Sequence, residues 1–125
     1  MSNETATCTE GRSLLPLLQD KDTDSWKSAV FWQYPRGHFN NHIPPHMGYS
    51  VRDNRFHYTE WVDIRRHGHH QYEPNWDKQA DHEELYDLQN DPQENYNLYD
   101  KEEFADIKKQ LSNALRAGWR EHNVP

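Results

Sequence analysis

The clearest hydrophobic pattern lies near the C-terminus, where apolar residues recur at helical spacing. These residues are Phe104, Ile107, Leu111, Leu115 and Trp119. Positions three and four apart share one face of a helix. Asp100 and Glu103 precede the run in the arrangement of a capping box. The pattern predicts a helix from about Lys101 to about Arg120 that packs one apolar stripe on the rest of the domain.

Period-two alternation marks a strand in the middle of the chain. One set is Phe56, Tyr58, Glu60 and Val62, and the other is His57, Thr59, Trp61 and Asp63. Neither set is purely polar, so we expect both faces of this strand to be partly covered. Residues 47–52 form a second run, and Asp53-Asn54 between the two predicts a hairpin turn. Residues 29–34 and 84–88 are further predicted strands, rich in aromatic and branched residues.

Loop composition separates these elements. Residues 35–46 hold three prolines and one glycine, and residues 64–83 have no periodicity, so both predict loops. After the strand at 84–88, Asp91-Pro92 opens a turn in which Asn90, Asn95 and Asn97 can bond the backbone locally. The predicted fold class is α+β: a small antiparallel sheet of about four strands packed by a C-terminal helix. The predicted core is Tyr49, Tyr58, Trp61, Leu85, Phe104, Ile107, Leu111 and Leu115.

Composition narrows the picture to one thin-cored domain. The 125 residues are 33% hydrophobic, with a mean hydropathy of -1.31, which by itself is typical of disorder. Five Trp, seven Tyr and four Phe argue against disorder, because each ring can bury about 150–250 Å². A core of rings with wet polar tips is expected to need a neighbouring domain for full stability.

Charge and cysteine content exclude several classes of protein. The net charge of -7 disfavours a nucleic-acid partner, which requires a basic stripe. The sequence contains no run of about 18 apolar residues, so no membrane span is predicted. Residues 1–13 lack the basic and apolar regions of a signal peptide. Cys8 is the only cysteine, so no internal disulfide can form. Nine histidines would make the chain far less negative at mildly acidic pH.

Five segments in order carry a family resemblance. They are CTEGRSLLPLL (8–18), FWQYPR (31–36), MGYSVRDNRFHYTEWV (47–62), ELYDLQNDPQENYNL (84–98) and ALRAGW (114–119). Together they resemble the C-terminal portion of sulfatases of the iduronate-sulfatase type, in the alkaline-phosphatase-like superfamily. The resemblance implies that residues 1–25 end the catalytic domain and connect it, and that residues 26–122 form the C-terminal subdomain.

The same resemblance implies a function that this chain cannot perform alone. Family members use a formylglycine made from the Cys of Cys-x-Pro-x-Arg and a calcium ion, whereas the cysteine here stands in Cys8-Thr9-Glu10-Gly11. We therefore expect no catalytic residue here, and place formylglycine and calcium in a catalytic domain that is this chain's partner. The implied parent is lysosomal or secreted and acts on a glycosaminoglycan-type substrate.

Two kinds of site residue are predicted within this frame. A structural set comprises Arg36, Tyr49, Arg52, Tyr58, Trp61, Tyr86 and Asp91. The guanidinium groups of Arg36 and Arg52 are expected to pair with Asp87 or Asp91. His38 and His46, in the loop expected to face the catalytic domain, are candidates for the rim of the substrate site. An apolar plug of Leu14, Leu15, Leu17 and Leu18 is expected to face the same partner.

A different class of function stays open. His67, His69 and His70, with Asp81 and His82 nearby, offer imidazole and carboxylate groups of the kind that bind zinc. The alternative hypothesis is therefore a stand-alone interaction or metal-binding module without catalysis. A serine hydrolase is disfavoured, since there is no Gly-x-Ser-x-Gly and Ser50 falls inside a predicted strand.

Overall fold

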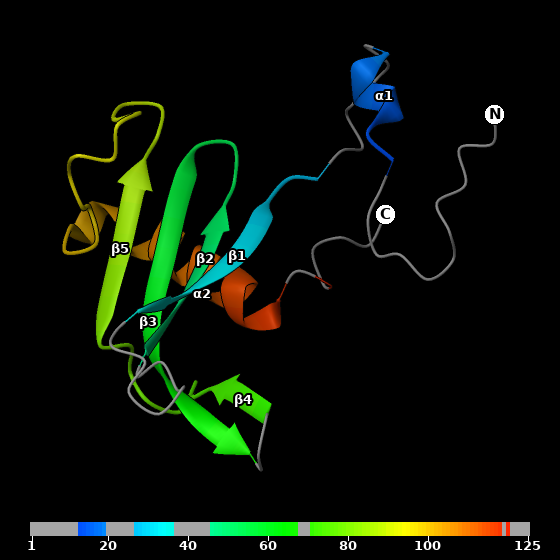
Figure 1. Cartoon of the computed structure of the whole chain (residues 1–125). Helices are drawn as coiled ribbons and strands as arrows, with labels where there is room; N and C mark the ends of the chain where they lie inside the picture. Colours follow the sequence, from blue (N-terminus) through cyan, green and yellow to red (C-terminus); the bar gives the residue numbers. More distant parts are fainter. Residues whose placement is uncertain (1–12, 20–26, 37–45, 68–70, 119, 121–125) are drawn as a thin grey trace.

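A computed structural model of the protein describes residues 13–19, 27–36, 46–67, 71–118 and 120. Figure 1 shows one curved sheet with a helix lying across one of its faces. In chain order the elements are α1 (Leu15–Leu18), β1 (Val30–Arg36), β2 (His46–Arg52), β3 (Phe56–His67), β4 (Gln71–Pro74), β5 (His82–Asp87), the 3₁₀ turn η2 (Glu102–Phe104) and α2 (Ala105–Ala117). The predicted α+β class is confirmed.

Every strand pairing in the sheet is antiparallel. β1 pairs with β2 and β2 with β3, while β4 and β5 both pair with β3. Residues 75–81 bulge out between β4 and β5, and two backbone bonds pin this segment to β3. Asn75 N donates to Asp63 O at 2.9 Å, and Asp81 N donates to Trp61 O at 2.9 Å. β4, residues 75–81 and β5 therefore lie one after another along β3 and together form one edge of the sheet.

The prediction of a loop over residues 64–83 is wrong at both of its ends. β3 continues to His67 and pairs with β4 from Ile64↔Pro74 to His67↔Gln71, and β5 begins at His82. Charged residues dominate here, so no alternation of apolar residues marks the strands. The pairing rests on backbone hydrogen bonds, with an exposed ion pair at 2.7 Å between Arg65 and Asp77 beside it. Residues 37–45 of the other predicted loop lie outside the described residues.

The β2–β3 hairpin turns at Asp53-Asn54, as predicted, but by a different device. The side chain of Asp53 holds the turn, since its Oδ1 accepts hydrogen bonds from Arg55 N (2.8 Å) and Phe56 N (2.6 Å). Among the described residues other than glycine, only Glu94 has a positive φ, at 55°. Side-chain hydrogen bonds therefore hold this turn without a left-handed backbone at Asp53 or Asn54.

The core lies between the sheet and α2. Its buried members are Val51, Phe56, Tyr58, Leu85, Leu111 and Leu115. Leu111 and Leu115 stand one turn apart on α2, which confirms the predicted helix phase. Tyr58 and Leu85 are also buried as predicted, whereas Tyr49, Trp61, Phe104 and Ile107 are only half-buried.

The predicted helix is shorter than expected at both ends. A 3₁₀ turn over Glu102–Phe104 precedes α2, and neither element has a side-chain capping bond. Lys101 occupies the N-cap position, so Asp100 lies one residue too early to cap the helix. At the other end, Gly118 has a φ of 86° and stops the helix at Ala117, because this backbone region favours glycine.

The turn after β5 protects an edge of the sheet. Asn97 Oδ1 accepts from Leu85 N at 3.0 Å, and Asn97 Nδ2 donates to the carbonyl oxygen of Glu83 at 3.1 Å. Leu98 N adds a bond to Leu85 O at 2.8 Å. The side chain thus replaces a further strand along this part of β5, which blunts a sheet edge that could otherwise pair with another chain. Asn97 therefore bonds the backbone as predicted, whereas Asn90 and Asn95 donate to the side chains of Asp87 and Asp91.

The leucines of the apolar plug are largely in solvent. None of the residues of α1 is buried, and the exposed fractions of Leu14 and Leu18 are 61% and 81%. Figure 1 shows α1 standing apart from the sheet. In the part of the chain that the structure describes, no helix has the length and apolar character needed to cross a membrane.

The substitution Leu111→Ala tests the core. Leu111 is 5% exposed, so removing its side chain should lower the free energy of unfolding by about 2–5 kcal/mol. The matched control is Leu18→Ala on the exposed α1, which should change it by less than about 0.5 kcal/mol. Urea unfolding followed by tryptophan fluorescence measures both. Equal losses in the two variants would contradict the assigned packing of α2.

Candidate functional site

A buried carboxylate connects the sheet to α2. Glu60 has no solvent exposure, and its Oε2 accepts from Arg116 Nη2 at 2.8 Å while its Oε1 accepts from Ser112 Oγ at 2.5 Å. Arg116 also donates to the carbonyl of Trp76 at 3.2 Å and lies over the Trp76 ring at 5.1 Å. One ion pair therefore links β3, α2 and the segment between β4 and β5.

A cluster of tyrosines and carboxylates adjoins this pair. The Tyr58 hydroxyl lies 2.6 Å from Glu83 Oε1 and 3.0 Å from Glu60 Oε1. Because a phenol has one proton, it donates to only one of these oxygens at a time. Burial, followed by the hydrogen bond to Glu83, raises the pKa of Tyr58. The hydrogen bond to Glu83, followed by burial, raises the pKa of Tyr99 to about 12. These phenols stay protonated at ordinary pH and act as donors.

Sequence reasoning did not identify the pair of Glu60 and Arg116. A signal was present, because Glu60 shares the inward phase of β3 with Tyr58 and Val62. A carboxylate at an inward position of a strand requires a buried donor. The position of that donor, Arg116, depends on how α2 crosses the sheet, which alternation within one strand cannot indicate.

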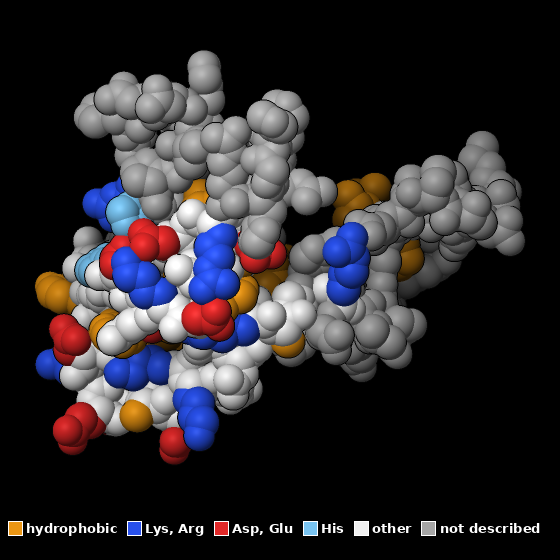
Figure 2. Space-filling model, turned by 90° about the horizontal axis from the view of Figure 1, so that it is seen from below, with side chains coloured by type: hydrophobic (Ala, Val, Ile, Leu, Met, Phe, Trp, Pro, Cys, Tyr) orange, Lys and Arg blue, Asp and Glu red, His pale blue; other side chains and the backbone are white. Residues whose placement is uncertain are grey.

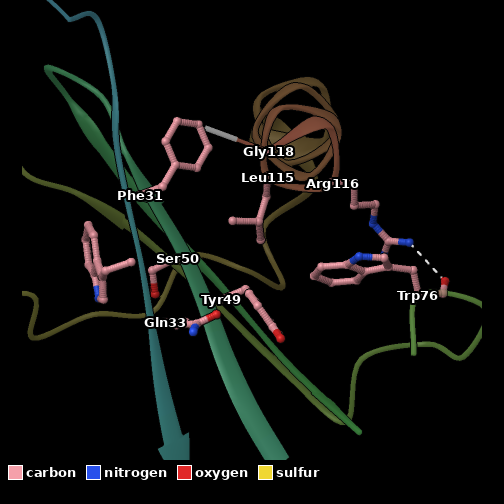
Figure 3. Close-up of a pocket in the computed structure, with 9 residues that line it drawn as sticks. Phe31, Gln33, Tyr49, Ser50, Trp76, Leu115, Arg116 and Gly118 are labelled. Carbon is pink, nitrogen blue, oxygen red and sulfur yellow. Dashed lines mark hydrogen bonds between the residues drawn. The ribbon is translucent and has the colours of Figure 1, made fainter. Parts of the chain in front are cut away.

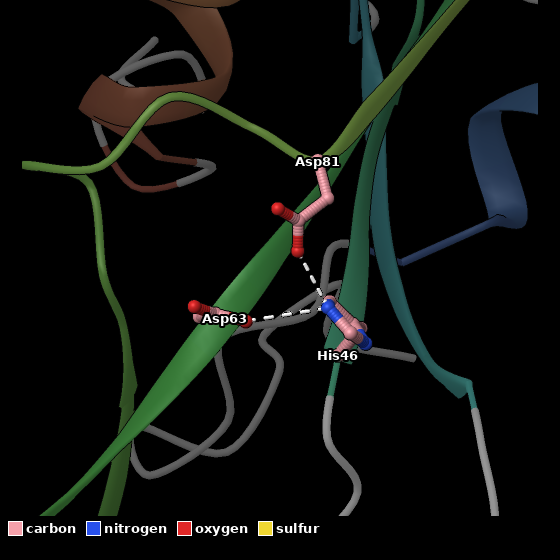
Figure 4. A group of neighbouring side chains, drawn as sticks. All are labelled: His46, Asp63 and Asp81. Carbon is pink, nitrogen blue, oxygen red and sulfur yellow. Dashed lines mark ion pairs between the residues drawn. The ribbon is translucent and has the colours of Figure 1, made fainter.

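A second cluster joins the start of β2 to the segment between β4 and β5. His46 Nε2 lies 2.5 Å from Asp81 Oδ2 and 3.2 Å from Asp63 Oδ1, and the three side chains converge in Figure 4. Lys78 Nζ lies 2.5 Å from Asp63 Oδ2 and 3.7 Å from Asp81 Oδ1. Its hydrogen bond to Asp63 lowers the pKa of that carboxyl, and the same bond raises the pKa of Lys78.

This geometry is that of an ion-pair cluster. His, Asp and Asp are suitable zinc ligands, but the ammonium of Lys78 already contacts both aspartates. The predicted site at His67, His69 and His70 has a different location. His67 ends β3, and nothing is described of its side chain or of His69 and His70, so that site stays a prediction.

A hollow of about 430 Å³ opens at the C-terminal end of α2. Figure 3 shows that Phe31, Tyr49, Trp76 and Leu115 contribute apolar walls, with Arg116 at one side. The rings of Tyr49 and Trp76 lie 5.1 Å apart, and burial raises the pKa of Tyr49. Because the guanidinium of Arg116 is already bonded to Glu60 and Trp76, it is not available as an anion receptor. The hollow resembles a packing surface more than a catalytic pocket.

The residues of the predicted structural set occupy two faces of the sheet. Tyr49 and Tyr58 face α2, whereas Trp61 and Tyr86 face away from it, where both bond Glu84 at 2.8 Å and 3.1 Å. Of the rim candidates, His38 lies outside the described residues, and His46 is in the ion-pair cluster. The structure does not test their contact with a substrate.

The predicted partners of Asp87 and Asp91 are wrong. Asp87, 3% exposed, accepts from Arg55 Nε at 3.1 Å and Nη2 at 2.7 Å, a bidentate pair between the β2–β3 turn and the end of β5. Asp91 instead accepts from Tyr96 N at 2.9 Å within its own turn. Arg36 lies over the Trp61 ring at 5.0 Å. Arg55 was missed because turn residues give no sign of their distant partners.

Charges of both signs are mixed on the surface. Figure 2 shows Lys and Arg side chains interspersed with Asp and Glu over the described part of one side of the molecule. This pattern agrees with a net charge of -7 and lacks the basic stripe of a nucleic-acid interface. Most of the charged groups described above bond another part of the domain and so stabilise its fold.

This arrangement of a small antiparallel sheet with a crossing C-terminal helix is that of a sulfatase C-terminal subdomain. Residues 3–121 match the family described as N-sulphoglucosamine sulphohydrolase, C-terminal. The chain therefore belongs to that family.

Similar proteins are much longer than this chain. The Ulvan-active sulfatase of Formosa agariphila is 32% identical over 118 residues, which cover 82% of this chain and 22% of that protein. A solved 2-O GAG sulfatase has a TM-score of 0.66 at 21% identity, covering 91% of this chain and 20% of the other. The chain thus spans about a fifth of these relatives. The iduronate-sulfatase type is not specifically indicated by either.

Two further solved structures share the fold. A protein in complex with its substrate D-glucosamine-2-N,6-O-disulfate has a TM-score of 0.63 at 22% identity, with 95% of this chain and 21% of the other covered. A phosphonate monoester hydrolase of Agrobacterium radiobacter has a TM-score of 0.61 at 20% identity, with 90% and 21% covered. At these identities the likeness shows the fold, which occurs with more than one kind of ester hydrolase.

The substitution Arg116→Leu tests the buried pair. It leaves the Glu60 carboxylate without its positive partner, which should cost about 3–5 kcal/mol of unfolding free energy in urea. The double variant Glu60→Leu/Arg116→Leu should recover part of this loss, because no uncompensated charge remains. Lys109→Leu, at an exposed position on the same helix, is the control. If the double variant loses as much unfolding free energy as the two single variants Arg116→Leu and Glu60→Leu lose in sum, the two residues are not coupled.

The pair of Arg55 and Asp87 predicts a dependence of stability on pH. Its hydrogen bond is the main cause that lowers the pKa of Asp87 from 3.8 to about 2. A carboxyl group whose pKa is lowered by folding stabilises the fold at pH values above its pKa in the unfolded chain. This contribution disappears as pH falls from about 4 to about 2. Urea midpoints of Asp87→Asn should therefore fall less steeply across this window than those of the unchanged chain. Asp77→Asn, at an 82% exposed carboxylate, should keep the original slope.

Proposed function

We propose that this chain is the C-terminal part of a sulfatase that hydrolyses sulfate esters of an acidic polysaccharide, and that it is inactive alone. The observation that carries the proposal is the family match over residues 3–121. The fold also supports the proposal, because the side chains within each described polar cluster bond one another. The role of the chain is to complete and support a catalytic domain on the remaining polypeptide.

Two relatives support the proposed substrate class. One is an Ulvan-active sulfatase and another is a 2-O GAG sulfatase, and both names indicate a sulfated polysaccharide as substrate. We extend this to a glycosaminoglycan-type substrate and an iduronate-sulfatase-like parent, which the ordered segments from CTEGRSLLPLL to ALRAGW support. A lysosomal or secreted location of the parent belongs to the same proposal.

The sulfate-cleaving groups belong to the catalytic domain in this proposal. Formylglycine would supply the nucleophile and calcium would bind the sulfate group there. Neither candidate group fits these roles, because Cys8-Thr9-Glu10-Gly11 is not Cys-x-Pro-x-Arg and Lys78 already contacts an oxygen of each aspartate in the His46 cluster. The ion-pair geometry also gives the alternative metal-binding module no support from the described residues.

A split-enzyme assay tests the proposal. The Ulvan-active sulfatase is expressed without the C-terminal part that matches this chain, and that part or this chain is added separately. We expect an aryl sulfate to remain uncleaved by this chain alone at pH 5 with calcium, and turnover to rise at least tenfold when the chain joins the truncated enzyme. The sulfatase's own C-terminal part is the positive control.

Two results would overturn the proposal. Turnover by the isolated chain above that of buffer would show that it carries its own catalytic groups. Restoration by the sulfatase's own C-terminal part but none by this chain would reject the supporting role.

A further inference from the structure

The sheet has a second face, turned away from α2, that described residues leave partly uncovered. We call it the open face, and strand register assigns to it Val30, Trp32, Tyr34 and Arg36 of β1, Gly48, Ser50 and Arg52 of β2, His57, Thr59 and Trp61 of β3, and Glu84 and Tyr86 of β5. Val30, Trp32 and Tyr34 are 50%, 41% and 67% exposed. Three large apolar side chains thus alternate along one edge strand.

Trp61 makes the centre of this face flat. It lies opposite Gly48, and a Cβ at Gly48 would come within 2.9 Å of the Trp61 ring. The ring therefore lies across the glycine instead of projecting from the sheet. The guanidinium of Arg36 stacks above it at 5.0 Å. A flat aromatic surface topped by an arginine is well suited to contact a second surface.

The polar groups around the rings are held in fixed positions. Ser50 Oγ and Thr59 Oγ1 bond at 2.7 Å, and both residues are at most 5% exposed. His57 Nδ1 bonds Glu94 Oε1 at 2.9 Å, and the His57 ring lies 4.8 Å from that of Trp32. Side chains that are already ordered lose little entropy when they bind a partner.

Charge favours a protein over a polysaccharide on this face. Arg52 is exposed and has no ion-pair partner among the described residues. Yet the carboxylates of Glu84 and Glu94 lie among the rings, and these would repel a sulfated chain. Trp, Tyr and Arg around a mainly apolar centre are instead enriched in protein interfaces.

We propose that the open face docks against the catalytic part of the sulfatase polypeptide, an inference that rests on the proposed function. The relatives' chains are about five times as long as the part that matches this chain. The remaining polypeptide is therefore large enough to cover the open face. α2 already covers the other face, where Leu111 and Leu115 are 5% and 7% exposed. Apart from the hollow at the C-terminal end of α2, the open face is the large surface of the described sheet that offers apolar rings.

Binding of face variants to the truncated Ulvan-active sulfatase tests the inference. Calorimetry measures the affinity of the unchanged chain, of Trp32→Ser/Tyr34→Ser and of Arg52→Glu. We expect each face variant to bind at least tenfold more weakly. Tyr96→Ser, at a 73% exposed tyrosine outside the strands of the open face, and Lys109→Glu on α2 are matched controls expected to bind within twofold of the unchanged chain. Circular dichroism and urea midpoints check that each variant folds. Arg52→Glu removes no aromatic ring, so it still tests the face if the double variant Trp32→Ser/Tyr34→Ser fails to fold.

The outcomes separate the two proposals. Binding by the unchanged chain with equal affinity in both face variants would overturn the docking face and leave the proposed function intact. No binding by the unchanged chain, where the sulfatase's own C-terminal part binds, would overturn both. If the isolated chain binds ulvan and the face variants lose only that binding, the face serves a polysaccharide and the inference is wrong.

Discussion

The ion pair of Glu60 and Arg116 sets how the two layers of the domain fit together. A carboxylate without solvent exposure is unfavourable unless its partners are placed around it, and here Arg116 and Ser112 reach it from successive turns of α2. The same helix rotation directs Leu111 and Leu115 into the sheet. Arg116 also holds the carbonyl of Trp76, so the segment between β4 and β5 depends on the same group. A thin apolar core thus has a polar centre that fixes its geometry.

The fold was predictable where side chains alternate and much less so elsewhere. Alternation in residues 56–63 gave β3 its strand and both of its faces, and helical spacing gave α2 its phase. β4 was not predictable, because its pairing with β3 relies on backbone bonds among charged residues. Likewise, the fork between Arg55 and Asp87 joins positions 32 apart in sequence, and no local pattern reports such a contact.

Family membership and site chemistry were predictable to different depths. Ordered segments were sufficient for the sulfatase C-terminal family, because they include the turn and strand residues that build the sheet. The metal site at His67, His69 and His70 stays a prediction, whereas the described cluster forms between His46 and two aspartates from separate segments. The docking surface proposed above depends on tertiary packing, which local sequence patterns do not report.

The contact between Trp61 and Gly48 has an evolutionary meaning. Because a Cβ at position 48 would meet the indole ring, position 48 cannot gain a side chain unless position 61 also changes. A lineage that acquires a side chain at 48 must accept a smaller residue at 61 or tilt the ring away from the sheet. Paired substitution at these two sites, directly opposite each other on β2 and β3, would therefore trace where a descendant has reshaped this surface for a different neighbour.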